Sequence, residues 1–223
     1  MSIYVAIFDS NGVLLDGSES NEYFNKEAIK LLKAAGIAAT AKMLDSAWIK
    51  AMRGTTPGED ELYITMGRFT KLLGAPPNLQ SEFVALHKSS TKLYRATEQD
   101  LRQSLTKIKR LGIYLAVLTD SINSKKEKED MLAYAGLGSI FDEIFVPMDT
   151  GHRKPDREAY EVALAHFKAR PENAVFVGHD KDELDGAKLM GMTTISYKGH
   201  QSADYAAGSF KDIIKILKSL KKS

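Results

Sequence analysis

An aspartate and an asparagine stand two residues apart at the end of the first apolar run of the chain. The run IYVAIF covers residues 3–8, and Asp9, Ser10 and Asn11 follow it before a turn at Gly12. A carboxylate at the tip of a buried strand can attack phosphorus and form a covalent intermediate, which divides one difficult step into two easier ones. The chemistry then depends on which polar residues join Asp9.

Polar residues follow the later apolar runs in the same way. They are, in chain order, Thr119 and Asp120, then Asp149, Arg153, Lys154 and Asp156, then His179, Asp180, Asp182 and Glu183. A hydroxyl and a lysine can hold phosphoryl oxygens. An oxygen-rich acidic cluster suits Mg²⁺, which neutralises phosphate charge and spares a carboxylate nucleophile from repulsion. The residue types therefore indicate phosphoryl chemistry, provided that these segments converge.

The predicted order of strands and helices brings these polar segments together. Short runs in which apolar and polar residues do not alternate predict strands that are covered on both faces. These runs are 3–8, 113–118, 143–146, 174–177 and 193–197. Helical patterns separate or follow the later runs; they are Glu98–Leu111, Asn123–Ala135, Asp156–Lys168, Glu183–Met190 and Phe210–Leu220. Such alternation predicts an α/β fold with a Rossmann-like parallel sheet, whose strands end at one edge.

One stretch breaks the alternation. Residues 18–95 read as helices only, with apolar residues at helical spacing, and we expect them to form a separate all-helical cap domain. The core domain then consists of residues 1–17 and 96–223. A cap inserted after the first strand would lie over the carboxyl ends of the strands, where open α/β sheets bind ligands.

The composition is that of a soluble globular protein and excludes several classes of site. The 223 residues carry a formal net charge of +2 and contain no cysteine, which excludes disulfides and thiolate chemistry and disfavours nucleic acid as a partner. The five histidines are scattered, which disfavours a zinc site. No apolar run approaches the ~18 residues of a membrane span, so we expect a cytoplasmic monomer or homodimer with no membrane partner.

Four segments resemble, in order and spacing, the four motifs of the haloacid dehalogenase (HAD) superfamily. They are FDSNGVLLD at 8–16, LAVLTD at 115–120, RKPD at 153–156 and VFVGHDKDELDGAKLMGM at 175–192. Together they span nearly the whole chain, and the helical insert between the first two is similar to the cap of this family. The resemblance implies a Mg²⁺-dependent hydrolase that acts on a small phosphorylated metabolite.

The resemblance also implies a role for each matching residue. Asp9 would be the nucleophile, the backbone carbonyl of Asn11 would bind Mg²⁺, and Thr119 and Lys154 would bind the phosphoryl group. Lys154 would also restrain the Asp9 carboxylate. The predicted phosphate-binding set is Ser10, Gly12, Thr119, Asp120 and Lys154, with the amides of Asn11 and Gly12 as additional donors. The predicted catalytic residues are Asp9, Asn11 and Lys154.

Two positions depart from the pattern of the family. Asn11 stands where most family phosphatases have an aspartate that protonates the leaving oxygen and activates water, which is help typically worth ~10²–10⁴ in rate. His179 stands where a metal-binding aspartate normally follows Val-Gly, and imidazole is a poor ligand for Mg²⁺. We expect Asp180 and Glu183 to reach the metal, beside Asp9 and Asn11, with His179 as a further candidate.

These departures leave alternatives open. A degenerate HAD domain would bind a phosphorylated ligand or a partner protein without turnover. A dehalogenase or phosphonate hydrolase would break a different bond, although Asn11 matches neither pattern. Several residues also have structural interpretations: Trp48 as cap core, the lysines near 125–128 and the sequence EKED as a solvated helix face, and Arg153 as either a substrate contact or an exposed charge.

Overall fold

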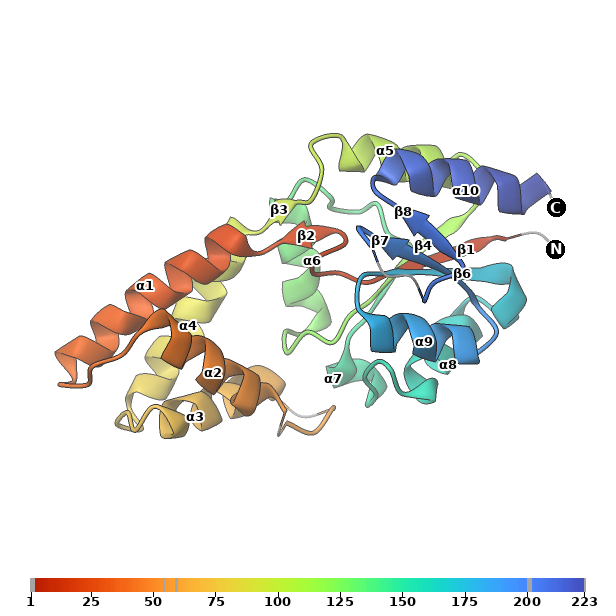
Figure 1. Ribbon diagram of the computed structural model, residues 1–223. Coiled ribbons are helices and arrows are strands. Elements are labelled where there is room, and N and C mark those ends of the chain that lie inside the picture. Colours follow the sequence, from red (N-terminus) through yellow and green to blue (C-terminus); the bar gives the residue numbers. More distant parts are fainter. Residues whose placement is uncertain (1–2, 54, 59, 200–201, 223) are drawn as a thin grey trace.

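Six parallel strands form the centre of the protein (Figure 1). The computed structural model describes residues 3–53, 55–58, 60–199 and 202–222. The strands are β1 (Val5–Phe8), β4 (Tyr114–Leu118), β5 (Glu143–Phe145), β6 (Ala174–Gly178), β7 (Thr193–Tyr197) and β8 (Tyr205–Ala207). Their order in the sheet is β5-β4-β1-β6-β7-β8. The predicted α/β fold with a parallel sheet is confirmed.

Helices cover both faces of this sheet, which explains why the strands are apolar throughout. The covering helices are α5 (Leu101–Lys109), α6 (Lys125–Tyr134), α8 (Arg157–His166), α9 (Lys181–Leu189) and α10 (Phe210–Lys222). In β1, Ala6 and Phe8 pack toward the side of α5 and α10, whereas Val5 and Ile7 pack toward the side of α8 and α9. Because alternate side chains of a strand point to opposite faces, both sets must be apolar.

The register of the central strands brings together the polar residues that follow each strand. Phe8, the last residue of β1, is paired with Val117 of β4 and with Val177 of β6. The three strands therefore end almost level, and the residues that follow them, Asp9 and Thr119 among them, meet at one edge of the sheet.

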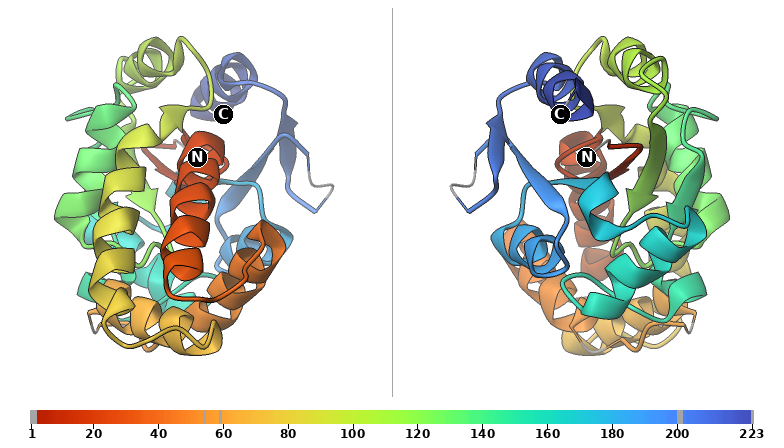
Figure 2. Two further views of the ribbon diagram at one scale, coloured as in Figure 1. Left: turned by 90° about the vertical axis from the view of Figure 1, so that its left-hand side faces the viewer. Right: turned by 90° about the vertical axis from the view of Figure 1, so that its right-hand side faces the viewer.

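Four helices lie beside this edge, away from the sheet (Figure 1). They are α1 (Ser18–Ala34), α2 (Ala41–Met52), α3 (Glu61–Leu72) and α4 (Leu79–Ser90). They pack around a hydrophobic cluster of their own, and Figure 2 shows α1 and α4 running side by side. The chain enters this bundle after β2 (Leu15–Asp16) and leaves it before β3 (Arg95–Ala96), and these two short strands pair antiparallel.

Sequence patterns missed the shortest elements. Besides β2, β3 and β8, these are α7 (Pro147–Thr150) and two single 3-10 turns, η1 (Thr91–Leu93) and η2 (Pro171–Asn173). A segment of two to four residues shows too little periodicity to be recognised. The ends of the predicted helices differ by up to three residues from the structure, as in α5, which covers Leu101–Lys109 rather than 98–111. In the described part of the chain, no helix combines the length and the apolar character needed to cross a membrane.

One expectation about the helices is wrong. The sequence predicts a solvated face for the lysines near 125–128, but the side chain of Lys128 on α6 has no exposed surface. Lys126 fits the expectation, since its side chain is 74% exposed and pairs with Asp130 one turn along the helix. At helical spacing, Lys128 falls on the inward face together with Met131 and Leu132, which are also buried.

Candidate active site

Asp9 is a buried carboxylate held between a lysine and a histidine side chain. Its backbone N–H donates to the carbonyl of Val177, which fixes the residue at the end of the sheet. Lys154 Nζ lies 2.6 Å from Oδ1, and His179 Nδ1 lies 3.1 Å from Oδ2. Burial alone would raise the pKa of Asp9, but Lys154 and His179 outweigh it and lower the pKa to about 2. The carboxylate is therefore ionised at neutral pH.

Lys154 is the cation around which the acidic residues gather. Besides Asp9, its Nζ donates to the carbonyl of Leu118 at 3.0 Å and lies 3.1 Å from Glu183 Oε2 and 3.9 Å from Asp120 Oδ2. Burial would lower the pKa of this ammonium group, but the attraction of Asp9, Asp120 and Glu183 raises it above the usual range of a lysine. Lys154 therefore stays charged and counterbalances three carboxyl groups.

The carboxyl of Glu183 has a raised pKa, unlike that of Asp9. Burial, with a smaller contribution from the nearby Asp9 and Asp120, raises the pKa of its carboxyl to about 7 against the opposing effect of Lys154. Its Oε2 is buried and makes no hydrogen bond of good geometry, despite the ion pair with Lys154. An oxygen of this kind, next to a second carboxylate, is suited to a cation.

The turn after β1 depends on a glycine. Gly12 has a φ of +82°, a conformation that glycine adopts without strain. A Cβ at this position would lie 2.8 Å from His179 Nε2, so the imidazole lies directly against the turn. The Gly12 N–H donates to the carbonyl of Leu15 at 2.8 Å. The amide is therefore engaged within the turn, and its role as an additional donor to phosphate stays a prediction.

The start of α9 orders the fourth motif. Asp180 caps this helix: its Oδ1 accepts from the N–H groups of Asp182 at 2.8 Å and Glu183 at 3.3 Å. The exposed Asp180 is thus engaged in capping and does not line the cavity described below. Gly186 lets the helix approach the loop of the third motif, because a Cβ there would lie 2.8 Å from the carbonyl oxygen of Pro155.

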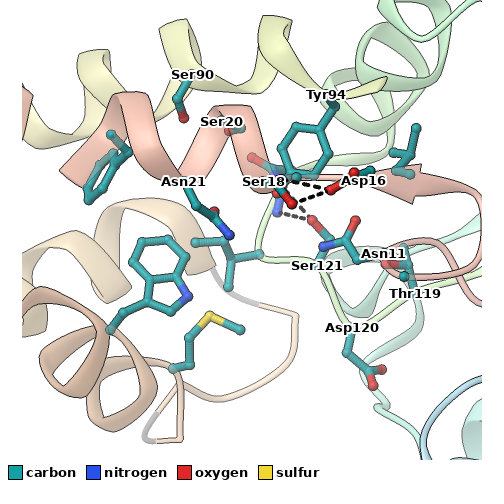
Figure 3. A pocket seen from close by; sticks show the side chains of 18 of the residues that line it. Asn11, Asp16, Ser18, Ser20, Asn21, Ser90, Tyr94, Thr119, Asp120 and Ser121 are labelled. Carbon is teal, nitrogen blue, oxygen red and sulfur yellow. Dashed lines mark hydrogen bonds between the residues drawn. The ribbon is translucent and has the colours of Figure 1, made fainter. Parts of the chain in front are cut away.

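A cavity of about 810 Å³ opens between the strand ends and the four separate helices. Its sheet side is lined by Asp9, Asn11, Gly12, Thr119, Asp120, Ser121, His179 and Glu183. Figure 3 shows Thr119 and Asp120 at this end of the cavity, with Asn21 on the side of α1. A ligand in this space would meet the Asp9 carboxylate and the Thr119 hydroxyl together.

Ser10 was expected to bind phosphate, and the structure places it elsewhere. Its side chain is fully buried, does not line the cavity, and accepts a hydrogen bond from Lys128 Nζ at 3.2 Å. Sequence reasoning missed this lysine as a neighbour of the site. The available signal was its inward position at helical spacing in α6.

Arg153 joins the two parts of the molecule. Its guanidinium donates to the carbonyl of Asp120 at 2.9 Å, to the hydroxyl of Thr55 at 3.2 Å, and to the carboxylate of Glu61. Glu61, at the start of α3, has no exposed surface. The residue next to Lys154 therefore ties the sheet edge to the separate helices.

A second contact between these two parts involves a histidine. His87 on α4 is buried, and its Nε2 lies 3.0 Å from Asn123 Oδ1. Burial lowers the pKa of His87 to about 4, so its imidazole is neutral at neutral pH. Neither this pair nor the contact of Arg153 with Glu61 could be read from sequence, because each joins residues 36 or 92 positions apart.

Comparison with known proteins places this site in a family. A sequence model of haloacid dehalogenase-like hydrolases matches residues 6–197. A glyceraldehyde 3-phosphate phosphatase of Methanocaldococcus jannaschii is 26% identical over 231 residues, which cover 97% of each chain.

Solved structures show the same fold. An L-2-haloacid dehalogenase from Xanthobacter autotrophicus is similar with a TM-score of 0.73 at 15% identity, over 97% of this chain and 98% of that one. A HAD phosphatase from Thermococcus onnurineus is similar with a TM-score of 0.70 at 20% identity, over 96% and 98%. The family match covers most of the chain and all four motif segments, and the protein belongs to the haloacid dehalogenase-like hydrolases.

Proposed function

We propose that the protein hydrolyses a small phosphomonoester through an aspartyl-phosphate on Asp9. The observation that carries this proposal is a carboxylate that is ionised, buried and open to a cavity. Its pKa is about 2, and Thr119 and His179 line the same cavity beside it. The relatives named as phosphatases support the same reaction class.

The reaction proceeds in two displacements. A carboxylate oxygen of Asp9 attacks phosphorus, the bond from phosphorus to the ester oxygen breaks, and the ester oxygen takes a proton from solvent water as the alcohol leaves. Water then attacks phosphorus, which releases inorganic phosphate and regenerates the carboxylate. Lys154 holds the attacking group through its contact of 2.6 Å with Oδ1 and offsets the negative charge that collects there. Thr119 supplies a hydroxyl donor to the phosphoryl oxygens.

Oxygen atoms suited to Mg²⁺ are present at this site. We assign them to the Asp9 carboxylate, the Asn11 backbone carbonyl and Glu183, whose Oε2 is buried without a hydrogen bond. Within residues 3–53, 55–58, 60–199 and 202–222, no three side chains of His, Cys, Asp or Glu are grouped so as to hold a metal ion. A site here would therefore depend on the backbone carbonyl. When bound, the ion would offset the charge of the phosphate group.

Asn11 limits the rate in this proposal. An amide exchanges no proton with the leaving oxygen or with water, so the general acid–base contribution of ~10²–10⁴ is missing from this position. Asn11→Asp restores a carboxyl group there and is expected to raise turnover by about that factor. Asn21→Asp is the matched control, because Asn21 lines the same cavity and the change adds the same charge away from Asp9.

Release of phosphate from phenyl phosphate tests the proposal. We expect release that is lost with a chelator, lost in Asp9→Asn, raised in Asn11→Asp and unchanged in Asn21→Asp. Release that survives Asp9→Asn would overturn the role of Asp9. If neither the wild type nor Asn11→Asp releases phosphate, the phosphatase proposal is wrong. Halide release from a 2-haloacid in chelator would then indicate dehalogenation.

A further inference from the structure

The side of the cavity formed by the separate helices carries a group of hydrophobic side chains among polar ones. Its hydrophobic lining comes from α1, α2 and the loop after β4 and consists of Phe24, Leu44, Trp48, Ile49, Met52 and Ile122. Ile49 is 52% exposed, although it is a large hydrophobic side chain. Apolar surface left open in a cavity beside a reactive group is typical of a ligand-binding site.

Three rings form one side of this region, and we call them the aromatic cluster: Phe24, Trp48 and His87. Trp48 stacks on His87 with ring centroids 5.5 Å apart and an angle of 24°. Phe24 meets Trp48 edge-on, with centroids 5.9 Å apart. Because His87 also contacts Asn123 at 3.0 Å, the cluster is joined to the loop after β4, and Trp48 is held by stacking on His87.

The charges around the cavity are predominantly negative. Asp16 and Asp45 line it, in addition to the carboxyl groups near Asp9. Among the described residues of its lining, Lys198 is the only lysine or arginine. Arg153 does not line the cavity and is bound to Glu61. Lys198 interacts with Asp16, so a second anionic group placed away from this lysine would meet repulsion rather than a partner.

Resting on the proposed function, we propose that this region is a subsite for the leaving alcohol, selective for a flat, apolar ring without a second anionic group. The ring would lie against the aromatic cluster while the phosphate group reaches Asp9. Aromatic contacts beyond simple burial are worth about tenfold in affinity. Glycolate-like or amino-acid-like leaving groups, which carry a carboxylate, would be disfavoured.

Three phosphate esters of primary alcohols test this selectivity, because their leaving groups differ little in reactivity. They are benzyl phosphate, propyl phosphate and 4-carboxybenzyl phosphate. We expect kcat/KM for benzyl phosphate to exceed both others by about tenfold. Trp48→Ala should reduce the preference for benzyl over propyl phosphate to near one. Tyr63→Ala, which removes a cap side chain that is 55% exposed and outside the cavity, should leave the preference unchanged.

A second variant guards against misfolding of Trp48→Ala. Asp45 is exposed on α2 and accepts a hydrogen bond from Asn25 at 3.1 Å. Asp45→Lys replaces a negative charge in the lining by a positive one. It should raise kcat/KM for the carboxybenzyl ester relative to the benzyl ester. An unchanged ratio would overturn the electrostatic part of the proposal.

Binding of the corresponding phosphonates separates this inference from the proposed function, because phosphonates need no turnover. Trp48 is the single tryptophan of the chain, so its fluorescence reports directly on a ligand that touches the aromatic cluster. Benzylphosphonate should bind about tenfold more tightly than propylphosphonate and change this fluorescence. That result would support the subsite even if no ester is hydrolysed. Phosphate release with equal affinity for the two phosphonates would overturn the subsite and leave the proposed reaction intact.

Discussion

Replacing Lys128 by methionine is expected to stabilise the protein at neutral pH. The Lys128 side chain is fully buried, and its Nζ donates one hydrogen bond, to Ser10 Oγ at 3.2 Å. Burial lowers its pKa to about 8; attraction to Asp9 raises the pKa and repulsion by Lys154 lowers it, but both effects are smaller. Methionine is similar in length to the aliphatic part of the lysine side chain and carries no charge.

The size of the effect follows from the pKa. A lysine has an ordinary pKa of 10.5, and that of Lys128 is about 8. With ~1.4 kcal/mol for each pKa unit, protonated Lys128 lowers the free energy of unfolding by about 3 kcal/mol. Loss of the hydrogen bond to Ser10 offsets roughly 1 kcal/mol of the gain. We therefore expect Lys128→Met to be about 2 kcal/mol more stable at pH 7.

The pH dependence identifies the cause. The folded protein holds the Lys128 proton less tightly than the unfolded chain, so the penalty is complete below pH 8 and disappears as the pH rises to 10.5. The advantage of Lys128→Met should accordingly shrink between these two values.

Urea unfolding followed by circular dichroism at pH 7 and pH 10 measures both effects. Lys126→Met is the control, because the Lys126 side chain is 74% exposed and its removal should change stability by less than ~0.5 kcal/mol. The reasoning is refuted if Lys128→Met is less stable than the wild type at pH 7, or if its advantage is the same at both pH values.

The remaining predictions concern the contacts between the two parts of the molecule and the turn after β1. Arg153→Met leaves the fully buried Glu61 without its cationic partner, and it should lower the free energy of unfolding in urea by about 3 kcal/mol. Adding Glu61→Gln should recover part of this loss. If Arg153→Met is as stable as the wild type, the stabilising role of this pair is contradicted. The pKa of His87 is lowered from 6.5 to about 4 by burial, so the folded protein binds the proton more weakly and should lose stability as the pH falls from 6.5 to 4. His87→Gln should show a smaller loss over this range, and equal slopes in the two proteins would count against the assignment. Gly12→Ala places a Cβ on a residue with a φ of +82° and within 2.8 Å of His179. It should lower the free energy of unfolding by at least ~1 kcal/mol and slow phosphate release. A variant with the stability and the kinetics of the wild type would contradict this prediction.

The sequence was sufficient for the parts of the structure that depend on local patterns. Apolar runs followed by polar residues located the strands of the sheet, apart from the three-residue β8, and strand topology then required Asp9 and Thr119 to meet. Short elements such as β8 were not predicted, because three residues show no measurable periodicity of apolar residues.

Side-chain orientation was the part that could not be predicted. Ser10 and Asn11 are adjacent, yet Ser10 turns inward to Lys128 while Asn11 lines the cavity. Asp180 was a reasonable candidate for the metal, but its position before α9 makes it a cap. Contacts between residues distant in the chain, such as Arg153 with Glu61, depend on how the separate helices settle on the sheet edge, which no local pattern records.

Detection of the covalent intermediate tests the central claim most directly. The protein is mixed with benzyl phosphate, quenched in acid within one turnover, digested, and analysed by mass spectrometry. We predict that the peptide containing Asp9 carries the added mass of one phosphoryl group, and that this mass is absent in Asp9→Asn. Phosphate release at an undiminished rate, with no phosphorylated Asp9 peptide at any quench time, would contradict the mechanism.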